Sequence, residues 1–102
     1  YGYLGMYDNA IADYLKVIEL NPDIAEAHNN LGMAYGNQGI YDKAIDGFTR
    51  AIELKPDYAQ AYNNRGIAYY RQGFMDKACQ DFKKAEELGF EGAKENVSRL
   101  CQ

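Results

Sequence analysis

The sequence is poor in the residues that most catalytic sites require. It has no tryptophan, two cysteines, one histidine (His28) and one serine (Ser98). A lone histidine without thiolate or carboxylate neighbours at ligand spacing does not build a metal site, and a single serine does not build a catalytic triad with it. We therefore expect a protein that is not an enzyme, with no cofactor and no metal. His28 is expected to lie in the packed interior.

Positive charge and long apolar runs are also scarce. The formal net charge is -4 at pH 7. An acidic surface repels phosphate backbones and anionic headgroups, so we expect neither nucleic acid nor a membrane as a partner. No apolar stretch approaches the roughly 20 residues that a membrane-spanning helix needs. Other proteins or peptides remain as the expected class of partner.

A repeat of 34 residues organises the rest of the sequence. Pro22 and Pro56 are 34 positions apart, and the same offset brings aromatic, small and acidic residues into register. Self-similarity at a period of this length is the signature of stacked supersecondary units. The recurring sets are Tyr1, Tyr35 and Tyr69; Gly5, Gly39 and Gly73; Asp8, Asp42 and Asp76; Ala10, Ala44 and Ala78; and Tyr14, Phe48 and Phe82.

Each complete period is predicted to contain two short antiparallel helices. In the unit 25–58, apolar and small residues recur every three to four positions, which is the spacing of one helix face. Gly39 suits the left-handed residue that ends the first helix, and Pro56 stops the second. Gly32 lies inside the first helix, where glycine costs about 1 kcal/mol relative to alanine. We therefore expect a large ring or a second backbone to approach Gly32 closely.

These residues closely resemble the tetratricopeptide repeat family. The unit 59–92 departs from the family pattern at Arg65 and Phe90, where leucine and proline are usual. The resemblance implies an all-α fold, an α-solenoid of antiparallel helix–turn–helix repeats in a right-handed superhelix, and a role in binding other proteins. The matching residues are Leu31, Gly32, Tyr35, Ala44, Phe48, Ala51 and Pro56, and then Tyr62, Gly66, Tyr69, Ala78, Phe82 and Ala85.

The N-terminal unit is incomplete. It keeps only residues 1–4 of its first helix, so the apolar stripe of its second helix (Ala10, Tyr14 and Val17) lacks the partner that should cover it. Uncovered apolar stripes tend to find another surface. We therefore expect homo-oligomerisation, by stacking or by exchange of an element, through this end of the chain.

The C-terminal segment has the pattern of a capping helix over residues 91–101. Its apolar stripe is Phe90, Ala93, Val97 and Leu100, and the residues between them are polar, as the end of a solenoid requires. The predicted organisation is a truncated first repeat (end of its first helix plus its second helix) at 1–24, repeats at 25–58 and 59–92, and a capping helix at 93–102.

The two cysteines have no disulfide or metal motif around them. Cys79 occupies the position of Ile11 and Ile45 in the other units, which is typical of a small buried hydrophobic residue. Cys101 ends the capping helix. We expect no native bridge between them, and therefore a reducing compartment and a cytoplasmic protein.

The resemblance also implies a ligand site, because the first helices of successive repeats line a concave groove in this family. Amides at these positions can bond a peptide backbone, and apolar side chains can hold an apolar one. The basic residues with which some family members clamp the acidic tails of chaperones are replaced here by Gln60 and Asn64. The candidate groove residues are Asn29, Asn30, Met33, Asn37, Gln60, Asn63, Asn64, Ile67, Tyr70 and Arg71.

Two functional hypotheses therefore remain. The first is a module that binds a peptide or protein segment in this groove. The second is a structural element whose repeats stack or swap between copies of the chain.

Overall fold

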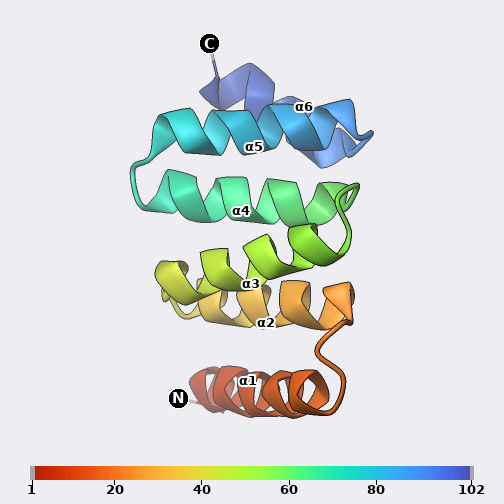
Figure 1. The fold of residues 1–102 in the computed structure, drawn as a ribbon. Coiled ribbons are helices and arrows are strands. Elements are labelled where there is room, and N and C mark those ends of the chain that lie inside the picture. Colours follow the sequence, from red (N-terminus) through yellow and green to blue (C-terminus); the bar gives the residue numbers. More distant parts are fainter. Residues whose placement is uncertain (1, 102) are drawn as a thin grey trace.

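The computed structural model describes the backbone of residues 2–101 and the side chains of residues 9–101. The helices in this part of the chain stack in sequence order from α1 to α6, and the two termini lie at opposite ends of the stack (Figure 1). No strand occurs between residues 2 and 101. The predicted all-α solenoid is confirmed. The helices are α1 (Gly2–Leu20), α2 (Ala25–Asn37), α3 (Tyr41–Leu54), α4 (Ala59–Arg71), α5 (Met75–Glu87) and α6 (Glu91–Leu100).

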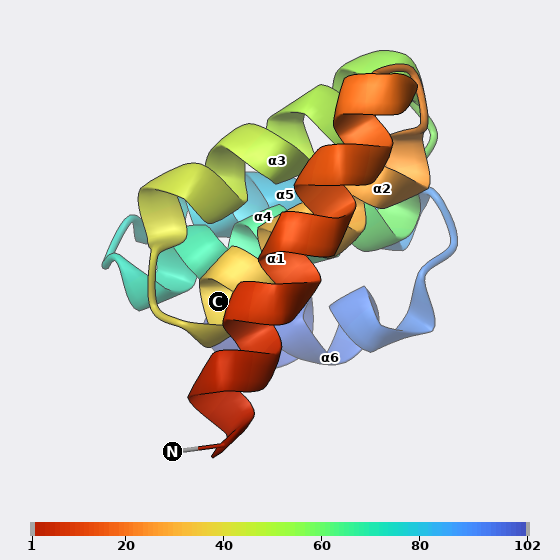
Figure 2. The same ribbon diagram turned by 90° about the horizontal axis from the view of Figure 1, so that it is seen from below.

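α2 with α3, and α4 with α5, form two helical hairpins that pack against each other. α2 packs on α3 and α4 packs on α5, while α1, α3 and α5 each pack on the helix that follows. α2 and α4 begin and end at equivalent positions of the 34-residue period. Figure 2, seen from the α1 end, shows α1 crossing the stack, with α6 at the far end. None of the helices in residues 2–101 combines the length and the apolar character needed to cross a membrane.

The turns after α2 and α4 are fixed by glycine. Gly39 and Gly73 have φ angles of +79° and +87°, a region that other residues rarely adopt. The backbone N–H of Ile40 donates to the carbonyl of Tyr35 at 2.9 Å, and Phe74 donates to Tyr69 at the same distance. This pattern closes the last helical turn and satisfies carbonyls that would otherwise lack a partner. The predicted helix end at Gly39 is confirmed.

An aromatic ring of the next helix approaches Gly32 of α2 and Gly66 of α4 too closely for a side chain to fit. A Cβ at Gly32 would lie 2.7 Å from Cε1 of Phe48 and 2.9 Å from the carbonyl oxygen of Ala44. A Cβ at Gly66 would lie 2.7 Å from the equivalent ring of Phe82. The predicted close approach at Gly32 is therefore confirmed, and the ring of α3 or α5 fills the space that the glycine leaves.

The single histidine has a structural role, as expected. His28 is buried in α2, and its Nε2–H donates to the carbonyl oxygen of Pro22 at 2.8 Å. The bond ties the linker between α1 and α2 to the first turns of α2. No group of three or more potential metal ligands occurs among the described residues.

The prediction for the N-terminal unit was wrong in one respect. The repeat places a turn at Gly5, but α1 is one helix from Gly2 to Leu20. A continuous helix adds a backbone hydrogen bond for each residue fixed, and a glycine inside it costs only about 1 kcal/mol relative to alanine. Tyr1, Gln102 and the side chains of residues 2–8, which the sequence analysis also used, lie outside the described part.

The repeat 59–92 contains a buried ion pair where the repeat 25–58 has Leu31 and Gly47. Arg65 of α4 donates from Nε and Nη2 to the two carboxylate oxygens of Asp81 in α5, each at 2.8 Å. Arg65 Nη1 also donates to Thr49 Oγ1 of α3 at 3.2 Å. The side chains of Arg65 and Asp81 are only 19% and 8% exposed. The hydrogen bonds to Asp81 raise the pKa of the Arg65 guanidinium, and burial opposes them. One side chain thus connects three consecutive helices.

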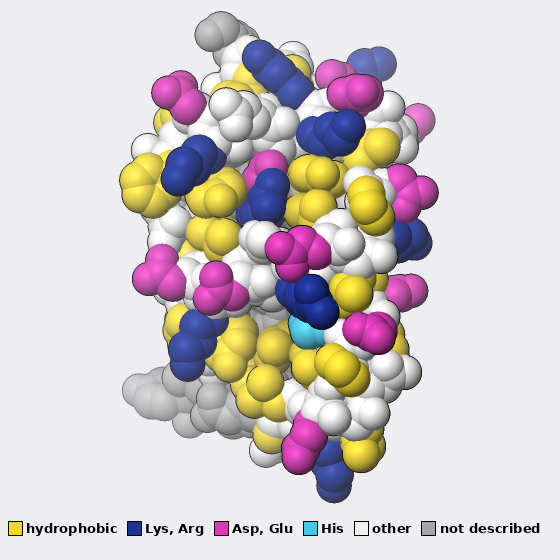
Figure 3. Space-filling view, viewed as in Figure 1, with side chains coloured by type: hydrophobic (Ala, Val, Ile, Leu, Met, Phe, Trp, Pro, Cys, Tyr) yellow, Lys and Arg dark blue, Asp and Glu magenta, His cyan; other side chains and the backbone are white. Residues whose placement is uncertain are grey.

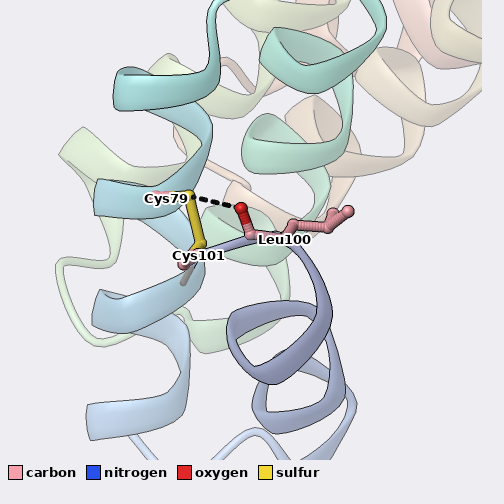
Figure 4. Close-up of a disulfide and its surroundings, with 3 residues drawn as sticks. All are labelled: Cys79, Leu100 and Cys101. Atoms are coloured by element: carbon pink, nitrogen blue, oxygen red, sulfur yellow. Dashed lines mark hydrogen bonds between the residues drawn. A yellow bond between two sulfur atoms is a disulfide. The ribbon is translucent and has the colours of Figure 1, made fainter.

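The expectation of two unbridged cysteines was also wrong. Cys79 of α5 and Cys101, which follows α6, form a disulfide with a Cα–Cα distance of 5.6 Å. Figure 4 shows the bridge beside the carbonyl oxygen of Leu100, which lies 3.6 Å from Cys79 Sγ. This is a contact without a shared proton, because a bridged sulfur carries no hydrogen. The argument for a reducing compartment rested on free thiols, and the bridge removes it.

Candidate functional site

The candidate site is an open pocket between the two complete repeats. It has a volume of about 310 Å³ and is formed by α2, α3 and α4. Phe48 and Ala68 form its floor and belong to the buried cluster that joins the two repeats. The lining residues are Met33, Gly36, Asn37, Tyr41, Phe48, Asn64, Ile67, Ala68 and Arg71.

Equivalent positions of the repeats 25–58 and 59–92 line the pocket together. Met33 and Ile67 are 34 residues apart and provide its exposed apolar walls, with 40% and 38% of their surface accessible. Asn37 and Arg71 are also 34 residues apart and add a polar row one helical turn further on. The pocket therefore has one apolar row and one polar row.

Only part of the predicted groove set lies in this pocket. Of the remaining residues, Asn30, Gln60 and Tyr70 are exposed and outside its lining, whereas Asn29 and Asn63 are buried. The structure brings together Met33, Asn37, Asn64, Ile67 and Arg71.

The buried asparagines link successive first helices through their side-chain amides. Asn64 of α4 donates from Nδ2 to Asn29 Oδ1 of α2 at 3.1 Å, and Asn96 of α6 donates to Asn63 Oδ1 of α4 at 3.0 Å. Asn29 Nδ2 also lies 3.8 Å from the sulfur of Met33. A buried amide without a partner is costly, so these bonds set the spacing of the helices behind the groove.

The electrostatics of the pocket are dominated by one cation. Arg71 is exposed, lies in the last turn of α4, and is the only charged residue among the described side chains that line the pocket. It forms no ion pair with a described carboxylate.

Burial raises the pKa of Tyr58, Glu26 raises it further, and a hydrogen bond with Asn29 lowers it. Tyr58 is therefore an uncharged phenol at neutral pH.

The surrounding surface carries charges of both signs. On the face shown in Figure 3, basic and acidic side chains are interspersed, and hydrophobic side chains gather between them. The pocket itself carries the positive charge of Arg71, although the formal net charge of the protein is -4.

Sequence reasoning missed the part of the pocket that α3 contributes. Phe48 was considered only as a packing residue of the repeat and Tyr41 was given no role, because family groove positions lie on the first helix of each repeat. The small residues Gly36 and Ala68 could have indicated this part of the pocket. Small side chains on α2 and α4 leave room through which residues of α3 reach the pocket.

Comparisons with known proteins decide the family. A model of the TPR repeat matches residues 1–39, and models of the tetratricopeptide repeat match residues 25–58 and 59–89. No curated protein matches the chain. The second TPR domain of human RPAP3 is 30% identical over 98% of this chain and 85% of that chain, with a TM-score of 0.88. The chain belongs to the tetratricopeptide repeat family.

Other solved structures are similar to this tetratricopeptide chain. MamA from AMB-1 is 35% identical over 84% of this chain, with a TM-score of 0.78, and this chain spans 51% of its length. The first TPR of Spaghetti (RPAP3), bound to the HSP90 peptide SRMEEVD, shares the fold at 23% identity, covering 96% of this chain and 85% of that one with a TM-score of 0.82. The human RPAP3 domain was solved with the HSP70 peptide SGPTIEEVD.

Proposed function

We propose that this chain is a protein-interaction module that binds a peptide or protein segment in the groove between its first helices. The observation that carries the proposal is the pocket between α2 and α4, where Met33 and Ile67 are exposed over a floor made by Phe48 and Ala68. Exposed apolar side chains that surround a concavity are the usual anchor for a partner's apolar residue.

The peptide complex of the human RPAP3 domain supports this proposal, because that domain shares the fold along nearly the whole chain. The HSP70 peptide itself is not carried over. Gln60 and Asn64 are neutral where a clamp for an acidic tail needs basic residues.

A phage-displayed library of random dodecapeptides, selected on the immobilised chain, tests the proposal. We expect Ile67→Asp to reduce binding of the enriched peptides at least tenfold, because a carboxylate in the apolar wall must be desolvated when a ligand binds. Ile40→Asp is the matched control, since Ile40 is equally exposed but does not line the pocket. A library without enriched binders, or equal binding to both variants, contradicts the proposal.

A second candidate function is self-assembly through α1. Leu15, Val17 and Leu20 are 46%, 41% and 80% exposed on this helix. Ala10 and Tyr14 are partly covered, because α2 packs against α1. The exposed apolar residues therefore differ in part from the predicted stripe, and they favour association between copies at this end.

A further inference from the structure

The spacing of the two rows in the pocket specifies a ligand pattern. Met33 and Asn37 are four residues apart on α2, and Ile67 and Arg71 are four residues apart on α4. Four residues of α-helix rise roughly 6 Å. In an extended peptide, residues i and i+2 point the same way and are separated by roughly 6.7 Å. An extended segment that runs along these helices therefore presents alternate side chains to the two rows.

We infer that the pocket selects an extended segment with an apolar side chain at one position and an acidic side chain two positions away. This inference rests on the proposed function and names its ligand class. The apolar side chain lies between Met33 and Ile67, above Phe48. The carboxylate meets the guanidinium of Arg71, which can donate two parallel hydrogen bonds to it.

Charge at the pocket favours an acidic partner residue over a neutral or basic one. Arg71 has no carboxylate partner among the described residues, so a ligand carboxylate does not have to displace an existing ion pair. Asn37, the other member of the polar row, is uncharged, so Arg71 is the cation that a ligand carboxylate meets there.

The single cation of the pocket favours an internal segment of a partner over a free chain end. A terminal carboxylate is fixed to the backbone and adds a second charge to that of an acidic last side chain. Binding both would require several convergent cations, and the pocket offers one. A single side-chain carboxylate matches a single exposed guanidinium.

The experiment uses fluorescein-labelled nonapeptides of glycine and serine, blocked at both ends, with leucine and aspartate placed two positions apart. Comparison peptides place the aspartate next to the leucine, place it three positions away, replace it by asparagine, or replace the leucine by serine. A further peptide ends in leucine, serine and aspartate with a free terminus. Binding to the full chain is followed by fluorescence anisotropy and by two-dimensional NMR up to millimolar peptide.

We expect the two-position peptide to bind about three- to tenfold more tightly than its asparagine counterpart, because an exposed charge-assisted pair contributes that much. Arg71→Gln should abolish this preference, because the variant cannot distinguish the aspartate from the asparagine by charge. Arg50→Gln is the control, since Arg50 is an exposed arginine outside the pocket. It should keep the preference.

Other results overturn the inference. These are equal binding of the aspartate and asparagine peptides, a preference that survives Arg71→Gln, tighter binding of an adjacent or three-position peptide, or a requirement for the free terminus. Failure of every nonapeptide to bind, while phage-selected peptides still depend on Ile67, refutes the ligand class alone. Failure of the phage selection as well refutes the proposed function.

Discussion

Gly32 and Gly36 lie one turn apart on α2, yet they differ in what surrounds them. A Cβ at Gly32 would overlap the Phe48 ring and the Ala44 carbonyl, whereas a Cβ at Gly36 would lie 3.8 Å from Ala44 Cβ, an ordinary contact. The same substitution at the two positions therefore separates the steric effect of a side chain from its effect on helix propensity.

We predict that Gly32→Ala lowers the free energy of unfolding by about 1–3 kcal/mol, because the Ala44 carbonyl belongs to the backbone and cannot move aside cheaply. Gly36→Ala should raise it by about 0.5–1 kcal/mol, because alanine loses less conformational entropy in a helix. Urea denaturation followed by circular dichroism measures both. Two changes of the same sign would contradict the packing described here.

Arg65 and Asp81 stand at the positions that Leu31 and Gly47 occupy in the preceding repeat. We predict that Arg65→Leu alone destabilises the chain by about 3 kcal/mol, because it leaves the Asp81 carboxylate buried without its cation. The double substitution Arg65→Leu with Asp81→Gly should recover all but about 1 kcal/mol, since it restores the other repeat's pair. A double-mutant cycle in urea measures the coupling, and additive losses would show that the two side chains act independently.

At the scale of the helices, the sequence predicted the features that recur with the 34-residue period. The turns after α2 and α4 follow from Gly39 and Gly73, and the helical spacing of both units occurs twice, so these signals are each supported by a copy. The proline stop after α3 has no copy after α5, because Phe90 stands at that position. α1 could not be predicted in the same way. A helix tolerates a single glycine at a cost of about 1 kcal/mol, so Gly5 alone does not fix a helix end.

The pocket was predicted in part for a related reason. Periodicity identifies the exposed face of α2 and α4, which gave Met33 and Ile67. It does not reveal which of two asparagines reaches the next helix, because Asn29 and Asn30 differ only in direction around the helix axis. The bond from Asn64 to Asn29 depends on the distance between two repeats, which the sequence of one repeat does not contain.

The sequence analysis missed the disulfide because the pairing follows from where the two cysteines lie relative to the turn between α5 and α6. Cys79 and Cys101 are equally far from Phe90, at the turn between α5 and α6, so they face each other when the helices fold back into a hairpin. No cysteine spacing motif encodes this arrangement.

We predict that reducing the bridge lowers the free energy of unfolding by about 3 kcal/mol, as closure of a loop of this length implies in the chain-entropy model. The separation is 22 residues. Urea denaturation with and without dithiothreitol measures the change. Cys101→Ser should match the reduced chain and should not respond to the reductant. Two reactive thiols in the untreated native protein would contradict the bridge.

At the scale of the whole molecule, the exposed apolar residues of α1 predict self-association. We expect the sedimentation coefficient to rise with concentration in analytical ultracentrifugation, and Leu20→Glu to suppress the rise, because a charge at a contact between copies must be desolvated. Leu20 is 80% exposed, so the substitution should leave the fold intact. Phe74→Glu, at an exposed apolar site away from α1, is the control. A constant sedimentation coefficient would contradict the prediction.

The Arg65–Asp81 pair also has a consequence for how such a chain can change over generations. A unit with leucine and glycine at these positions and one with arginine and aspartate cannot be converted into each other by two harmless single substitutions. The arginine alone, or the aspartate alone, would be a buried charge with no counterion. Such a conversion requires both replacements together, or an intermediate with stability to spare. The two repeats share one backbone fold, but at this pair of positions their residues can be exchanged only together.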